Sequence, residues 1–122
     1  MSKMYDFLRE CGTFFVLTVN GDYPAGRPFG VVIEKEDDLY LATNDMNQVH
    51  KQMRENSQIQ IIAKKSDSRE WIRITGTVQE CKDNSVVEMM VDEFEVMQKK
   101  YGSGNREHLL IFKMKVEKVE FY

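Results

Sequence analysis

Hydrophobic and polar residues alternate in several short segments of the chain, which is the pattern of β-strands with one buried face. Most of these segments are rich in aromatic and β-branched residues, and short turns such as Gly21-Asp22 separate them. About six strands are expected, at residues 13–20, 25–34, 39–43, 58–63, 71–80 and 110–116. Because short turns join antiparallel strands, the pattern favours an antiparallel barrel over a doubly wound parallel sheet.

Three other segments space their apolar residues by three and four, which is the helical period. They lie at residues 4–11, 46–56 and 83–100, and the last is the longest. Gly12 follows the first segment as a natural stop, and Asn56 tolerates the left-handed geometry that ends many helices. The expected fold class is therefore mainly β (α+β), with about six strands and three helices.

Length and composition set limits on the class of protein. The chain has 122 residues, of which 42% are hydrophobic and 30% are charged, so residues 1–122 are expected to form one globular domain. A net charge of -3 gives no extended positive field for nucleic acid. Cys11 and Cys81 are too few for a disulfide framework, and no segment has the length of a membrane span. We therefore expect a soluble, cytoplasmic protein that binds neither nucleic acid nor membrane.

The segment RPFGVV, from Arg27 to Val32, is the first candidate for ligand binding. It places a permanently charged forked donor beside Pro28 and Gly30, residues that let a backbone present its amides to a ligand. Proline also supplies no ladder donor, so this part of the strand should lie at a sheet edge or beside a ligand. The alternative is an ordinary strand with an ion-paired arginine and a glycine bulge.

The segment ATNDMNQVHKQM, from Ala42 to Met53, is the second candidate. It brings Thr43, Asn44 and Asn47 to an expected helix N-terminus, where unpaired amides attract anions such as phosphate. The alternative is a well-capped surface helix without a ligand, because asparagine is a common cap.

Trp71 is the only tryptophan, and the alternation places it opposite Ile72 and Ile74. Its ring could line a pocket, or it could pack in the core or at an interface between subunits. His50 is expected to be exposed, and neither histidine has companions at metal-ligand spacing, so no metal site is expected. Motifs of hydrolases, P-loops and dinucleotide-binding folds are absent from the sequence.

Taken in order, these segments resemble the pyridoxamine 5'-phosphate oxidase-like split barrels over nearly the whole chain. The resemblance is carried by the first helix and by the runs TFFVLTVNGDYPAGRPFGVV, DDLYLATND, QVHKQMREN and WIRITGTV. Within that superfamily the chain looks closest to the short branch of nitroimidazole-resistance (NimA-like) proteins, which are FMN-binding homodimers. The resemblance implies a six-stranded antiparallel split β-barrel with FMN at the subunit interface.

The resemblance also implies roles for individual residues. Arg27 would bind the flavin phosphate or the ribityl chain. The backbone of the next four residues would contact the edge of the isoalloxazine: Pro28, Phe29, Gly30 and Val31. Thr43 would bind the phosphate, and Ala42 stands in the place of the family's tyrosine.

Other positions depart from the family pattern. Val32 stands where the oxidase has a lysine, and Asn47 with Gln48 stands where relatives place Ser, Arg or Lys near the phosphate. Lys51, one helical turn further on, would replace the missing charge. Trp71 occupies the position of a glutamine that reaches the flavin from the other subunit.

The long C-terminal extension with which the true oxidase recognises its substrate is missing, so oxidation of pyridoxamine phosphate is disfavoured. The function implied by the resemblance is an FMN-dependent oxidoreductase that takes electrons from a small-molecule donor and passes them to a nitroaromatic, a quinone or a similar acceptor. The alternative is a non-catalytic FMN or small-ligand binding protein, such as a carrier or sensor. The sequence assigns no catalytic residue.

Overall fold

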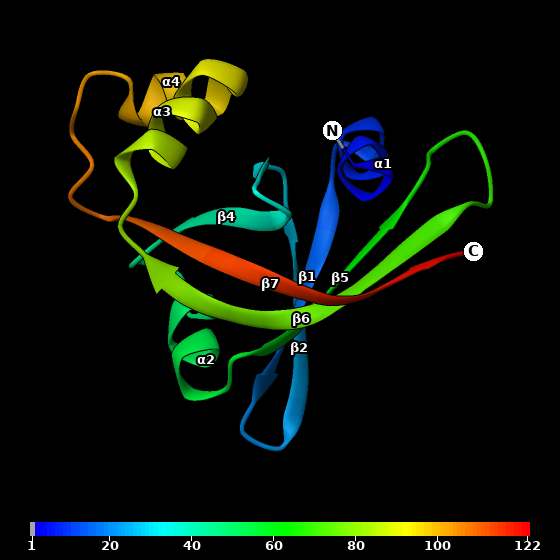
Figure 1. Cartoon of the computed structure of the whole chain (residues 1–122). Coiled ribbons are helices and arrows are strands. Elements are labelled where there is room, and N and C mark those ends of the chain that lie inside the picture. The colour runs from blue at the N-terminus through cyan, green and yellow to red at the C-terminus, as the bar shows by residue number, and fades with distance from the viewer. Residues whose placement is uncertain (1) are drawn as a thin grey trace.

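Seven antiparallel strands form one sheet in the order β2-β1-β5-β6-β7-β4-β3 (Figure 1), in a computed structural model that describes residues 2–122. The strands are β1 (Phe14–Asn20), β2 (Tyr23–Phe29), β3 (Val32–Lys35), β4 (Asp38–Asn44), β5 (Gln58–Lys64), β6 (Trp71–Cys81) and β7 (Leu109–Phe121). The helices are α1 (Lys3–Cys11), α2 (Val49–Glu55), α3 (Asn84–Glu93) and α4 (Glu95–Tyr101). The expected mainly β, antiparallel fold is confirmed.

The expected counts of six strands and three helices were wrong, each by one element. The segment 25–34 is not one strand, because its pairing with β1 ends at Phe29 and pairing with β4 begins at Val32. The segment 83–100 is not one helix, because Phe94 is extended, with φ -123° and ψ 119°. The amide of Phe94 closes α3 and its carbonyl accepts the first bonds of α4.

The two strands on either side of Gly30 and Val31 lie at opposite edges of the sheet. The three peptide steps from Phe29 to Val32 span at most about 11 Å. The sheet must therefore curl until its two edges approach each other at this junction, which we call the seam (Gly30–Val31). No pairing joins β2 to β3 among residues 2–122, so a short covalent link, and not a hydrogen-bonded ladder, brings the edges together.

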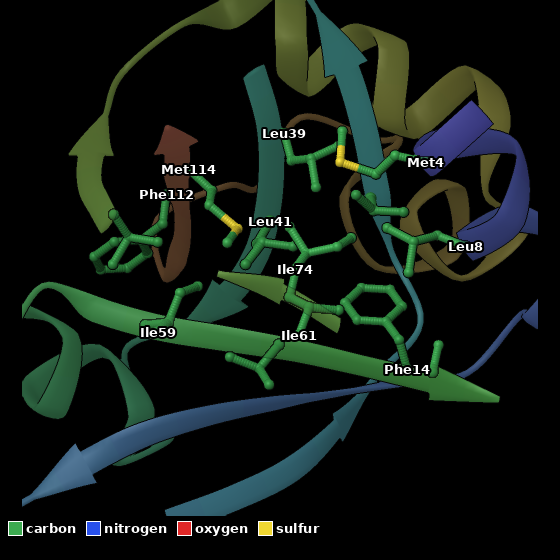
Figure 2. Packing of buried hydrophobic residues seen from close by; sticks show 14 of the residues in the cluster. Met4, Leu8, Phe14, Leu39, Leu41, Ile59, Ile61, Ile74, Phe112 and Met114 are labelled. Atoms are coloured by element: carbon green, nitrogen blue, oxygen red, sulfur yellow. The ribbon is translucent and has the colours of Figure 1, made fainter. Parts of the chain in front are cut away.

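The curled sheet and α1 enclose the main core (Figure 2). Phe14, Ile61 and Ile74 come from three adjacent strands, and each has no exposed surface. The expected alternation on β5 is confirmed, because Ile59 and Ile61 are buried while Gln58 is exposed. Helix α1 adds its apolar face and stops at Gly12, as expected, where φ is 77°.

A second, smaller core lies between the sheet and the α3–α4 pair, which is inserted between β6 and β7 (Figure 1). Ile33 and Tyr40 from β3 and β4 pack with Val86, Met90 and Met97 from the two helices. The α3–α4 pair is therefore fixed beside the strands that lead away from the seam.

Close approach between β6 and β7 requires a glycine. The β6–β7 register shifts between Thr75 and Gly76, and a β-carbon on Gly76 would lie 2.2 Å from the carbonyl oxygen of Lys115. Only a residue without a side chain fits there. Strand β2, which contains Pro24 and Pro28, lies at one edge of the sheet. Of the two places expected for Pro28, a sheet edge or beside a ligand, the edge is therefore confirmed.

Candidate functional site

A cavity of about 350 Å³ opens at the seam. One wall comes from the ends of β2 and β4 and from the turn that follows β4, and the other comes from α4 and the first residue of β7. The lining residues are Pro28, Phe29, Gly30, Val31, Ala42, Thr43, Asn44, Asn47, Val96, Met97, Lys100, Tyr101 and Leu109. The volume falls in the range of about 300–1,000 Å³ that is usual for small-molecule sites.

The seam contributes backbone as well as side chains to this cavity. Gly30 and Val31 lie outside both flanking ladders, which end at Phe29 and begin again at Val32. A β-carbon on Gly30 would meet nothing within 4 Å, so the backbone there faces open space. Backbone groups that no ladder uses are available to a ligand.

The turn after β4 is organised by its own side chains. Asn47 donates a hydrogen bond from Nδ2 to Oγ1 of Thr43 at 3.3 Å, and Oδ1 of Asn44 accepts from the amide of Met46 at 2.9 Å. The Thr43 side chain is almost buried, with 9% of the residue exposed. Because its oxygen already accepts from Asn47, the Thr43 hydroxyl is left as a donor.

The expectation that His50 is exposed was wrong. His50 lies in α2 with only 5% of its surface exposed, and its Nδ1 forms a hydrogen bond with the carbonyl of Asn47. Burial is tolerated because the ring nitrogen has this backbone partner. His50 thereby helps to fix the turn that lines the cavity.

The helical wall was not predicted from the sequence. Val96, Met97, Lys100 and Tyr101 recur at helical spacing and so share one face of α4. That spacing is a signal, but it also fits an ordinary core face, and only the packing of α4 beside the seam distinguishes the two. Met97 is buried, whereas Val96 is 47% exposed and lies at the open side.

Charge in the cavity is of one sign. Among residues 2–122, Lys100 is the only charged residue in the lining, and no Asp or Glu lines the cavity. Burial, and then the charge of Asp45, raises the pKa of the Tyr101 phenol, so this group stays protonated at neutral pH. Asp45 is paired with His108 at 3.0 Å, and the hydrogen bond raises the pKa of His108. The lining therefore favours an electron-rich or anionic ligand.

Arg27 lies outside the cavity lining, on β2, in a network of neutral oxygens. Its Nη1 donates to the carbonyl of Val16 at 3.0 Å and to Oγ1 of Thr18 at 2.8 Å, and its Nη2 donates to Oε1 of Gln52 at 2.6 Å. Arg27 has no carboxylate partner among residues 2–122. Burial lowers the pKa of its guanidinium, which reflects the cost of removing the charge from water.

Four further residues singled out in the sequence do not line the cavity. Val32 is 1% exposed and packs in the main core, where its carbonyl accepts from the hydroxyl of Tyr5. Gln48 caps α2 without a side-chain hydrogen bond, and Lys51 is exposed one turn further on.

Trp71 lies at the end of β7 opposite the cavity. It stacks on Tyr122 with ring centroids 4.4 Å apart, and its backbone pairs with Tyr122 beyond the last residue of β7. The cavity meets the first residue of β7, Leu109, so about 40 Å of strand separates the two places. Within one chain, Trp71 and the seam cavity are separate sites.

Residues 2–122 contain no group of three or more His, Cys, Asp or Glu side chains placed to hold a metal ion. In the same range, none of the helices has the length and apolar character needed to cross a membrane.

Comparison with protein families matches residues 1–122 to the model described as pyridoxamine 5'-phosphate oxidase. No curated protein matches the chain in sequence. Among solved structures, a NimC/NimA family protein from Clostridium acetobutylicum is 28% identical, with a TM-score of 0.88 over 98% of this chain and 85% of that one.

Two more distant structures share the fold. The heme storage protein HutZ from Vibrio cholerae has a TM-score of 0.78 at 13% identity, covering 98% of this chain and 91% of that one. An FAD-binding protein from Mesorhizobium loti has a TM-score of 0.67 at 14% identity, covering 99% of this chain and 94% of that one. Proteins with different named ligands are thus built on this architecture.

Proposed function

Because this chain belongs to the pyridoxamine 5'-phosphate oxidase family, we propose that it is a flavoprotein that binds FMN at the seam. The observation that carries the proposal is that most residues expected to hold a flavin line one cavity: Pro28, Phe29, Gly30, Val31, Ala42, Thr43, Asn44 and Asn47. They come from separate strands and the turn after β4, so sequence proximity alone does not bring them together.

The residues present fit a flavin with a phosphate group. The unpaired backbone at Gly30 and Val31 can contact a planar ring, while Phe29 and Val31 supply apolar surface. Arg27 has no acidic partner in the described chain, and its Nη2 donates to Gln52, the residue that follows Lys51 in α2. A phosphate near Arg27 would receive charge-assisted hydrogen bonds.

FMN is favoured over the other cofactors named for proteins of this fold. A cavity of about 350 Å³ lies at the small end of the usual range, which suits a mononucleotide better than FAD. Heme is commonly held by His or Cys, and neither occurs in the lining that the described residues form.

We propose an oxidoreductase in which a flavin, when bound, would supply electron transfer from a nicotinamide donor to a small nitroaromatic or quinone. The chain itself would bind and orient the cofactor through Arg27, Thr43 and the seam backbone. Lys100 would favour negative charge near the ring, and the face of α4 that carries it would form one wall of the site.

One observation favours the second candidate function, a non-catalytic flavin carrier or sensor. Within the described part of the chain, the cavity lining has no carboxylate, His or Cys, and burial raises the pKa of Tyr101. The side chains therefore offer no general acid or base suited to neutral pH. Steady-state oxidation of NADH or NADPH with nitroaromatic and quinone acceptors separates the two, because a carrier would not sustain turnover.

We propose a homodimer as the functional state. Phe15 on β1 is 49% exposed, and Leu17 lies two residues further along the same face, beside a groove of about 410 Å³. Such an apolar strand face can gain stability by pairing with a second copy. A second copy could also bring its Trp71 to the flavin. Sedimentation velocity at low concentration tests this, and Phe15→Glu should shift a dimer to monomer.

The cellular compartment proposed is the cytoplasm. Cys11 and Cys81 are both free thiols in the structure, which suits a reducing environment.

An absorbance spectrum of the purified protein, before and after addition of FMN and removal of free ligand, tests the central proposal. A retained flavin band near one equivalent per chain is the expected result. A heme band would show that the protein binds heme, and the FMN assignment would be wrong. If no flavin is retained after reconstitution, the flavoprotein proposal is wrong.

A further inference from the structure

The guanidinium of Arg27 is held by three oxygen atoms, and none of them carries a charge. They belong to the Val16 carbonyl, the Thr18 hydroxyl and the Gln52 side-chain amide. A partly buried arginine is usually paired with a carboxylate, because an unpaired charge is costly to remove from water. The three neutral acceptors satisfy three N–H groups of Arg27 and leave its positive charge without a negative partner.

Thr18 and Gln52 form a unit that fixes the direction of this side chain. Thr18 is 3% exposed, and its hydroxyl donates to Oε1 of Gln52 at 2.6 Å while it accepts from Nη1 of Arg27. The same Gln52 oxygen accepts from Nη2. Two neighbouring donors of Arg27 are therefore held by two atoms that also bind each other, one from β1 and one from α2.

The remaining donors of Arg27 are available to a ligand. A guanidinium has five N–H groups, and the contacts with Val16, Thr18 and Gln52 use three. The Nε–H and one Nη2–H have no hydrogen bond to residues 2–122. Nε and Nη2 lie on the same edge of the guanidinium, which can bind two oxygens of a phosphate in parallel.

We infer that Thr18 and Gln52 are positioning residues that hold Arg27 through neutral oxygens, so that its full charge and one edge are reserved for the phosphate of the ligand. This inference rests on the proposed flavin function. It assigns a role to Thr18 and Gln52, neither of which is among the site residues expected from the sequence. A glutamate at position 52 could make the same hydrogen bonds, but it would neutralise the guanidinium. The neutral amide is therefore the feature that matters for anion binding.

The test compares FMN with riboflavin, which has the same ring and no phosphate. For the unmodified protein, the ratio of the two dissociation constants measures how much the phosphate contributes. Gln52→Glu is expected to reduce that ratio by about tenfold or more, because the phosphate would meet a neutralised partner. Gln52→Leu and Thr18→Val should reduce it by a smaller factor, because Arg27 keeps its charge and loses its direction. Thr18→Ser keeps the hydroxyl, so its ratio should equal that of the unmodified protein.

Controls separate this role from a structural one. Gln79→Glu adds the same charge at an exposed position on β6, and it should leave the ratio unchanged. Riboflavin affinity reports whether each variant still folds around the ring site, and thermal melting checks stability independently. Folded Gln52→Glu and Thr18→Val proteins with the unmodified FMN to riboflavin ratio would overturn the inference and leave the flavoprotein proposal standing. An unmodified protein that binds neither flavin would overturn both.

Discussion

Gly76 and Lys115 lie closer together than two side-chain-bearing residues can. A β-carbon on Gly76 would lie 2.2 Å from the carbonyl oxygen of Lys115 and 3.1 Å from its carbonyl carbon. The obstacle is backbone of the neighbouring strand, so it cannot rotate away as a flexible side chain would. This contact accompanies the register shift that lets β6 bend across the sheet.

We predict that Gly76→Ala destabilises the protein by about 2 kcal/mol or more, because the strands must separate to admit a methyl group. Urea denaturation followed by circular dichroism measures the change. Gly30→Ala is the matched control, since a β-carbon there meets nothing within 4 Å, and its free energy of unfolding should change little. Equal stability of the two variants would contradict the contact at β6–β7.

Arg27→Ala should weaken FMN binding by about 1.5–3 kcal/mol, the usual cost of losing a hydrogen bond to a charged group. Riboflavin binding should change far less, because it has no phosphate. Arg27→Lys keeps the charge without the forked geometry. Its affinity for FMN should lie between those of the unmodified protein and Arg27→Ala. Fluorescence titration of both flavins measures these affinities. An Arg27→Ala protein that binds FMN normally would place the phosphate elsewhere.

Lys100→Glu should weaken the binding of anionic ligands by about fivefold to tenfold, because it introduces a negative charge into a cavity without carboxylates. The loss should shrink as salt is added, since the site is open to solvent. Lys99→Glu is the matched control, because Lys99 lies outside the lining and pairs with Glu95. The prediction fails if both variants weaken FMN equally.

Asp83 should make stability depend on acid pH. Its side chain caps α3 through Ser85 and contacts Lys35 at 3.1 Å; the Ser85 hydrogen bond, and then Lys35, lowers its pKa to about 2 from 3.8. A carboxyl with a depressed pKa stabilises the folded state above its unfolded value, 3.8, and that contribution is lost as pH falls towards about 2.

Asp83→Asn keeps a capping side chain but removes the charge, so its stability should fall less steeply between these two pH values. Urea midpoints at a series of acid pH values measure this. Asp67→Asn, in an exposed turn, should keep the slope of the unmodified protein. A slope unchanged by Asp83→Asn would mean that other carboxyls dominate acid unfolding.

The strands were predictable because the alternation of apolar and polar residues lies within each strand's own sequence. Ile59 and Ile61 alternate with glutamines, and Gly12 ends a helix through a local conformation. The missing donor of Pro28 predicted a sheet edge or a position beside a ligand, and the edge is what the sheet order shows. Such features depend only on the residue itself and its neighbours in the chain, so they can be predicted from sequence.

The missed features depend on partners that are distant in the chain. Nothing local in RPFGVV indicates that its two halves belong to opposite edges of a sheet. Phe94 breaks the helix without Gly or Pro, and the two helices that it separates both pack on the second core. His50 is buried by the packing of α2 against the sheet, and the helical wall of the cavity exists only because α4 returns to the seam.

The two prolines of β2 also bear on how the protein avoids self-association through its sheet edges. Residues 24, 26 and 28 direct their backbone nitrogens the same way, and proline is accommodated on an edge strand when its nitrogen faces away from the ladder. Of these three nitrogens, only that of Gly26 carries a hydrogen. An incoming strand would meet several carbonyl acceptors but almost no N–H donors along β2. Addition of a further strand at this edge is therefore disfavoured. The face of the sheet that carries Phe15 and Leu17 does not depend on these backbone groups and can still pack against a second copy.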